Sequence, residues 1–141
     1  MIINLTQHCA TREQISQGAV DLPPAQRGHL IELLTVNSLP TSDEIRARCN
    51  DIALLAVHNG LGGDGDDPHP LEAMIGGAPW MMSALEKALI NHGVTPIYAF
   101  SVRESVETVV DGGVMKTATF RHVGFVRTEG QQSHPTHTPA P

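Results

Sequence analysis

Ala73-Met74-Ile75-Gly76-Gly77-Ala78-Pro79-Trp80-Met81-Met82 is the stretch that decides the fold of this 141-residue chain. Its first three residues are apolar and predict a short buried strand, and Pro79 is typical of the first position of a helix. The predicted helix continues on an apolar face to Leu89 and ends at Gly93. A strand that turns through paired glycines into an amphipathic helix predicts an α/β fold.

The segments on either side of this turn predict a Rossmann-like, mostly parallel sheet flanked by helices. Residues 94–102 form the best strand pattern and follow a predicted helix, as in a parallel crossover. Residues 1–5 predict a buried first strand. Residues 106–110 and 114–120 flank Asp111-Gly112-Gly113, so we also expect a C-terminal β-hairpin.

Two more helices are expected nearer the N-terminus. Thr11 and Gln14 have the spacing of a capping box, and Gly18 would end that helix. A longer helix is predicted to start at Pro40-Thr41-Ser42, to run to about residue 58 and to end at Gly60. Residues 20–24 predict a break. Residues 29–36 fit either a strand or a helix, and we favour a strand.

The length fits one domain, which we place at residues 1–126, followed by a disordered polar tail at 127–141. The polar Gly- and Pro-rich residues 61–70 predict a mobile surface loop. No apolar run is long enough to span a membrane. The two cysteines, Cys9 and Cys49, with no apolar leader, favour a cytoplasmic protein.

The charge balance limits the partners of the chain. Nine Lys and Arg residues against fifteen Asp and Glu residues give a net charge of -6. Long nucleic acids bind through many neutralised phosphates, so we do not expect them as partners. A small anion held by a few local groups is compatible with this charge.

The glycine turn is the first candidate site. Backbone N–H groups at the head of a helix bind phosphate, and Gly76 and Gly77 would let a ligand approach the backbone. Trp80 offers a ring for stacking on a base. The alternative is a tight turn with no ligand, in which Trp80 packs in the core.

Two other polar segments are expected at the same edge of the sheet, because ligands gather beyond the carboxyl ends of parallel strands. Thr6-Gln7-His8 follows the first strand, and Ser101-Val102-Arg103-Glu104 lies at the carboxyl end of the later one. His8 would move a proton, Ser101 would donate a hydroxyl bond, and Arg103 would hold a phosphate. In the alternative, Arg103 pairs with Glu104 on the surface and His8 only caps a helix.

We predict no metal site and no cofactor. The eight histidines form no metal-binding spacing on a predicted helix or hairpin, and His134 and His137 lie in the tail. Asp64, Asp66 and Asp67 do not fit a calcium loop. Cys9 lies near a helix start but has no evident catalytic partner.

The order of these motifs resembles small CRISPR-associated CARF-like proteins, which include stand-alone ring nucleases. The resemblance rests on Asn4-Leu5-Thr6-Gln7-His8 leading to Gln14, on residues 99–107 (Ala-Phe-Ser-Val-Arg-Glu-Ser-Val-Glu) and on residues 120–125 (Phe-Arg-His-Val-Gly-Phe) as a closing hairpin strand. In that group the later strand runs into an Arg-containing turn and then a hairpin. The likeness spans most of residues 1–126.

This resemblance implies a homodimer that binds a cyclic oligoadenylate, the second messenger of type III CRISPR systems, across the dimer axis. It implies metal-independent cleavage in which a ribose 2′-hydroxyl attacks its adjacent phosphate, which would switch the signalling off. His8, Ser101 and Arg103 would be the catalytic residues. The ligand would be bound by Thr6, Gln7, Gly76, Gly77, Ala78, Pro79, Trp80 and Glu104.

The chain departs from this pattern in having no Lys beside the glycine turn, and the acidic residues 64–67 would repel an anion. Whether it is an enzyme therefore stays open. One alternative is a non-catalytic sensor or sponge for the same ligand. Another is a protein-interaction module whose contact surface is formed by Trp80, Met81 and Met82.

Overall fold

The computed structural model describes residues 1–60 and 70–128. The loop expected at 61–70 lies almost entirely outside this range, as does the expected tail after residue 128. No helix in the described ranges is both long enough and apolar enough to cross a membrane.

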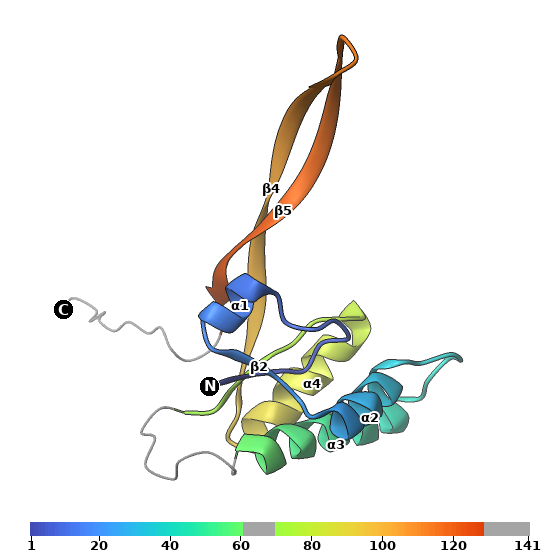
Figure 1. The fold of residues 1–141 in the computed structure, drawn as a ribbon. Coiled ribbons are helices and arrows are strands. Elements are labelled where there is room, and N and C mark those ends of the chain that lie inside the picture. The colour runs from blue at the N-terminus through green and yellow to red at the C-terminus, as the bar shows by residue number, and fades with distance from the viewer. Residues whose placement is uncertain (61–69, 129–141) are drawn as a thin grey trace, which may run out of the picture.

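The structure is an α/β domain with a five-stranded mixed sheet flanked by helices (Figure 1). The strands are β1 (Ile2–Asn4), β2 (Ala19–Asp21), β3 (Glu72–Met74), β4 (Thr95–Val110) and β5 (Gly113–Val126). The helices are α1 (Arg12–Ser16), α2 (Pro24–Leu34), α3 (Ser42–Gly60) and α4 (Pro79–Asn91). The strand order is β2-β1-β3-β4-β5, in which all pairs except β4 with β5 are parallel.

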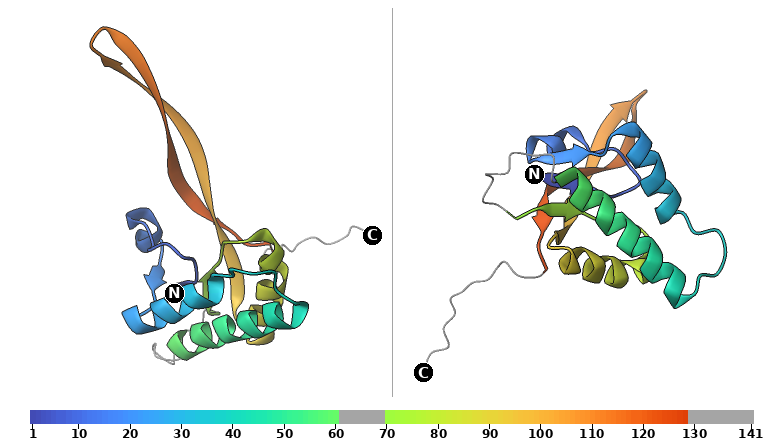
Figure 2. Two further views of the ribbon diagram at one scale, coloured as in Figure 1. Left: turned by 90° about the vertical axis from the view of Figure 1, so that its right-hand side faces the viewer. Right: turned by 90° about the horizontal axis from the view of Figure 1, so that it is seen from below.

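The main core lies between the sheet and α2, α3 and α4, which cover one face of it (Figure 2). Ile3 and Ala73 from the strands meet Leu30, Ile52 and other apolar residues of the helices there. The opposite face carries a smaller buried cluster of Ile2, Met74 and Ile97, against which Phe125 of β5 packs. Since successive strand residues face opposite sides, both faces of these short strands are buried, which explains their continuous apolar runs.

The first and last predicted helices begin at the residues whose patterns predicted their starts. Thr11 and Gln14 form the capping box of α1, and Pro79 stands in the first turn of α4. Helix α3 begins at Ser42, as predicted, with Asp43 and Glu44 in its first turn.

Two sequence interpretations near the N-terminus were wrong. Residues 29–36, which we expected to form a strand, lie mostly in helix α2, because Leu30 and Leu34 are buried against α3 at helical spacing. The break expected at residues 20–24 is also wrong, since its first two residues lie in strand β2. The three residues of this strand pair in register with β1, so a partner strand overrides a weak local pattern.

The C-terminal hairpin differs most from the prediction. Residues 94–102 and 106–110 are not two strands separated by a turn, since β4 runs without interruption from Thr95 to Val110. Only its first residues pair with β3, and from Tyr98 onward it pairs with β5. Figure 1 shows the result, a long two-stranded arm that projects from the domain.

Candidate ligand-binding pocket

A pocket of about 450 Å³ lies where the parallel strands β1, β3 and β4 end. Its lining comes from the segment after β1, from α1 and its N-cap, from the end of β3 with the glycine turn, and from β4. The residues are Thr6, Gln7, His8, Cys9, Thr11, Gln14, Met74, Ile75, Gly76, Gly77, Tyr98 and Ala99. This is the edge at which α/β sheets bind ligands. The structure therefore brings two of the three expected segments together.

Asn4 shapes the part of the pocket that follows β1. Its side chain is fully buried, and its Nδ2 donates to the His8 carbonyl oxygen at 2.7 Å and to Asp21 Oδ1 at 2.8 Å. Its Oδ1 accepts from the Thr6 amide at 2.9 Å and from Thr6 Oγ1 at 2.7 Å. Asp21 also accepts from the Ala10 amide at 3.0 Å. Residues 6–10 are thus fixed by a partly buried polar network that starts from Asn4 on the sheet.

The glycine turn forms the opposite side of the pocket. Gly77 has a φ of 144°, which a residue with a Cβ rarely adopts. Within the described residues, the amides of Gly76, Gly77 and Ala78 donate to no acceptor, whereas the Met81 amide bonds to the Ala78 carbonyl oxygen at 3.0 Å. The turn therefore presents N–H groups that are available to a ligand at the head of α4.

Tyr98 borders the pocket from β4. Its hydroxyl donates to Glu86 Oε2 of α4. Burial, followed by this hydrogen bond and the negative charge of Glu86, raises the pKa of the Tyr98 hydroxyl well above its usual value. The phenol therefore stays protonated around neutral pH and fixes β4 against α4.

Ser101, Arg103 and Glu104 do not line this pocket. We expected them at the carboxyl end of the strand, but β4 continues through them into the arm, past an irregularity between Phe100 and Ser101. Glu104 pairs with Arg121 of β5, with 2.7 Å between Arg121 Nε and Glu104 Oε1, and not with Arg103. The alternative of an Arg103–Glu104 pair is therefore wrong, and the convergence of all three segments at one pocket is not observed.

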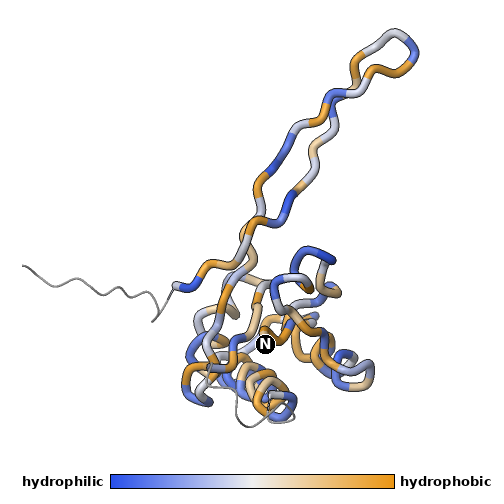
Figure 3. The backbone as a smooth tube through the Cα atoms, turned by 60° about the vertical axis from the view of Figure 1, so that its left-hand side comes forward, coloured by the Kyte–Doolittle hydropathy of each residue, from blue (hydrophilic) through white to orange (hydrophobic). Residues whose placement is uncertain are grey.

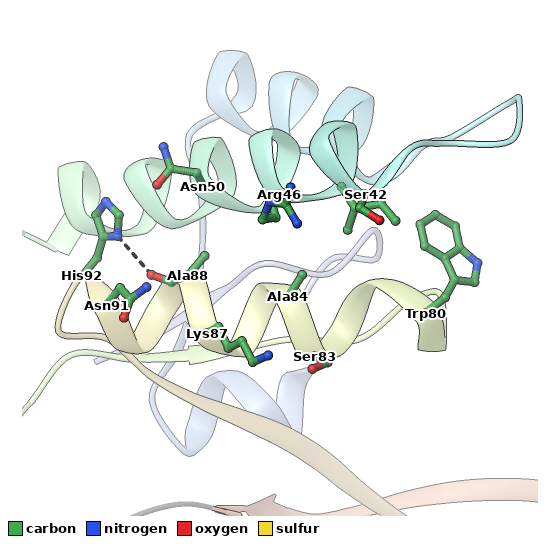
Figure 4. Close-up of a pocket in the computed structure, with 11 residues that line it drawn as sticks. Ser42, Arg46, Asn50, Trp80, Ser83, Ala84, Lys87, Ala88, Asn91 and His92 are labelled. Carbon is green, nitrogen blue, oxygen red and sulfur yellow. Dashed lines mark hydrogen bonds between the residues drawn. The ribbon is translucent and has the colours of Figure 1, made fainter.

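The last residues of the predicted glycine-turn site also lie outside the pocket. Ala78, Pro79 and Trp80 are not among the residues that line the pocket. Trp80 is half exposed and lies at one end of a separate groove of about 550 Å³ between α3 and α4, which Arg46 and Lys87 also line (Figure 4). The alternative in which Trp80 packs in the core is thus wrong.

Two further alternatives are settled by burial and capping. Met81 is 1% exposed and belongs to the core, so it cannot contribute to a contact surface with Trp80 and Met82. The N-cap of α1 is Thr11, so His8 does not cap that helix. His8 is instead an exposed residue on the pocket wall.

Sequence reasoning missed three residues that build the pocket, which are Asn4, Asp21 and Tyr98. Asn4 interrupts the apolar run of β1, and a polar residue in a buried strand indicates a side chain with fixed partners. That pattern was available in the sequence. Asp21 and Tyr98 carry no such local pattern, because their partners lie 17 and 12 residues away.

The fold and the pocket define an α/β protein with a candidate small-ligand site at the carboxyl ends of its parallel strands. Residues 1–126 match the family model described as "Uncharacterized protein MJ1673 family", and the chain belongs to this family. The match ends at the last residue of β5. Comparisons with curated proteins and with solved structures gave no significant match.

Proposed function

We propose that this protein binds a small phosphorylated ligand in the strand-end pocket and that this ligand is a cyclic oligoadenylate, as the resemblance to CARF-like proteins implies. The observation that carries the proposal is the free glycine-turn amides, which lie at the head of α4 and beside the residues after β1. Amides of this kind bind phosphate oxygens without needing a basic side chain.

The chemistry of the lining supports an anionic ligand. The chain is acidic overall, yet none of the described residues that line this pocket is an Asp or Glu. Thr11 supplies a hydroxyl, and Gln7 and Gln14 supply side-chain amides, whereas the hydroxyl of Thr6 already donates to Asn4 Oδ1. A phosphate in this pocket therefore meets donors and no carboxylate on the pocket wall.

Calorimetric titration with cyclic tri-, tetra- and hexa-adenylate tests the binding. We expect Gly76→Leu to weaken binding at least about tenfold, because its side chain enters the pocket beside Thr6. Gly28→Leu adds the same side chain in α2, where nothing lies within 4 Å, and should bind like the wild type. Absence of heat with all three rings would remove the proposal.

Cleavage is a second candidate function, and binding without cleavage is the one that the pocket favours. Cleavage needs the 2′-oxygen to bond to the phosphorus while the bond to the 5′-oxygen breaks, with a proton leaving the first and another reaching the second. His8 is the one proposed catalytic residue on the pocket wall, and the described lining includes no Lys or Arg to stabilise the charge. A non-catalytic sensor agrees with this set of residues.

Incubation with cyclic tetra-adenylate and EDTA, followed by chromatography, separates the two. Linear products that His8→Ala abolishes while ligand is still bound would establish a ring nuclease that stops type III CRISPR signalling. An intact ring recovered after denaturation would establish the sensor or sponge. Ser101→Ala and Arg103→Ala should leave the affinity for the ligand unchanged, because neither residue lines the pocket.

A further inference from the structure

We propose that the long arm formed by β4 and β5 is the surface through which two copies of this chain associate. The arm comprises residues 101–122, the part of the hairpin beyond the irregularity at Phe100 and Ser101. The proposal does not depend on what the pocket binds. It assigns the arm a partner and names the residues that make the contact.

The arm is poorly supported as a structure on its own. It is a two-stranded ribbon, and a two-stranded hairpin without further packing is marginally stable in water. Figure 3 shows apolar residues distributed along it far from the helices. Three of them are among the most exposed large apolar residues of the described chain, with 75% exposure for Phe120, 74% for Val109 and 64% for Val114. Their exposure indicates a surface that another element covers.

These three residues share one face of the ribbon. Successive residues of a strand alternate between faces, and directly opposite residues of an antiparallel pair lie on the same face. The pairs on this face, from base to tip, are Arg103 with Phe120, Ser105 with Ala118, Glu107 with Lys116 and Val109 with Val114. We call this set the arm face. At the base, the next row toward the domain is occupied by His122, whose ring contacts Gln17 and Phe125.

The arm face is complementary to itself. Its middle row consists of the small residues Ser105 and Ala118, and the rows on either side carry opposite charges on β4, positive at Arg103 and negative at Glu107. Consider two arms stacked face to face and antiparallel, with a two-fold axis through the middle row. Arg103 of each copy then lies over the partner's Glu107.

The β5 strands match in the same arrangement. Phe120 of each copy lies over the partner's Lys116, where an ammonium group and an aromatic ring attract each other. The small middle residues let the two ribbons approach closely, as in packed sheets about 10 Å apart. Arg103 has no ion-pair partner within the described part of its own chain, so it is available for this contact. Glu107 and Lys116 lie 3.7 Å apart in an exposed ion pair, which the partner's Arg103 would extend.

A charge exchange tests this arrangement. Sedimentation and native mass spectrometry of the full chain should give twice the 15.1 kDa chain mass. Arg103→Glu places a carboxylate opposite Glu107 at two symmetric positions, and Glu107→Arg places two cations opposite each other. Each variant alone should dissociate at least about tenfold more readily than the wild type.

Mixing the two variants gives the decisive result. In a mixed pair the new glutamate at position 103 faces the new arginine at position 107, and Glu107 of one copy faces Arg103 of the other. Both contacts become attractive, so we expect a heterodimer that is much tighter than the pair formed by either variant alone. It should be weaker than the wild-type dimer, because Glu107→Arg also replaces the ion pair between Glu107 and Lys116 of its own chain by two neighbouring cations. A misfolded variant would not be rescued by mixing. Thr117→Glu adds a charge at the middle level of the opposite face and should leave the dimer intact.

Three outcomes would overturn the proposal. These are a wild-type chain that stays monomeric at all concentrations, single variants that dimerise as well as the wild type, and single variants that dissociate but form no heterodimer on mixing. None of these outcomes depends on nucleotide binding, so they are distinguishable from failure of the proposed function.

Discussion

Asn4 is the polar side chain on which the pocket wall depends most. It has no exposed surface, and all of its hydrogen bonds go to Thr6, His8 and Asp21. Thr6 and His8 line the pocket, so one side chain of the first strand positions both of them. Removing that side chain leaves partly buried groups of Thr6, His8 and Asp21 with fewer hydrogen-bond partners and leaves a cavity beside the core.

We expect Asn4→Ala to lower the free energy of unfolding by about 2–4 kcal/mol and to weaken any ligand that contacts residues 6–8. Thr35→Ala removes an exposed hydrogen bond to the Ile31 carbonyl oxygen and should change stability by less than about 0.5 kcal/mol. Urea denaturation of both variants measures the difference. Equal stability of the two would show that the Asn4 network carries little energy.

The two cysteines should differ sharply in reactivity. Cys9 is exposed on the pocket wall, whereas Cys49 is buried in the core and burial raises its pKa to about 11. A thiol reagent at pH 8 should therefore modify one cysteine per native chain, and both after denaturation. Peptide mapping identifies which. A bound ligand should slow the reaction at Cys9, and reaction at Cys49 first would contradict the structure.

At the scale of elements, β4 joins two different structures. Its first residues complete the parallel sheet beside β3, and the remainder forms the arm with β5. The arm ends in a turn where Asp111 and Gly112 have φ values of 48° and 78°. Such a turn favours glycine because a Cβ is strained at positive φ.

Gly112→Val should therefore loosen the tip of the arm while leaving the domain folded. Gly113→Val is the matched control, because Gly113 has no positive φ and a Cβ there would meet only the Val110 carbonyl oxygen at 3.6 Å. Hydrogen exchange should become several-fold faster at residues 106–118 in the first variant and change less in the second. Exchange that rises equally in both variants would contradict the turn geometry.

At the scale of the whole molecule, stability should fall in alkaline solution. Cys49 ionises near pH 9 when unfolded but only near pH 11 in the folded core, so between these values the folded state holds a proton that the unfolded state has lost. Folding is then opposed by rising pH, by at most about 1.4 kcal/mol per pH unit from this thiol. Tyr98, whose pKa is also raised, adds to the loss above pH 10.

Denaturation at pH 8, 9 and 10 tests this. Cys49→Ala should be less stable throughout because it leaves a cavity, but its stability should depend less on pH between 9 and 10 than that of the wild type. Cys9→Ala, which removes an exposed thiol outside the core, is the control chain. The same pH dependence in all three chains would exclude Cys49 as the cause.

What the sequence alone determined is the local structure that its own residues specify. The capping box at Thr11, the start of α3 at Ser42 and the turn from β3 into α4 were all predictable, because caps, prolines and glycines act within one helical turn. The same local reasoning located Thr6, Gln7, His8, Gly76 and Gly77 at one edge of a parallel sheet, where they line the pocket.

Only the tertiary structure decided which segments continue and which side chains meet. Residues 24–34 became a helix because α3 buries their apolar face, and β4 extends past Ser101 because β5 pairs with it. For that reason Ser101, Arg103 and Glu104 lie in the arm and do not line the pocket. Tyr98 lines the pocket, and Asn4 holds the segment that forms one of its walls. The contacts that stabilise α2 and the long β4 are made with residues far apart in the chain, so the pattern of neighbouring residues does not reveal them.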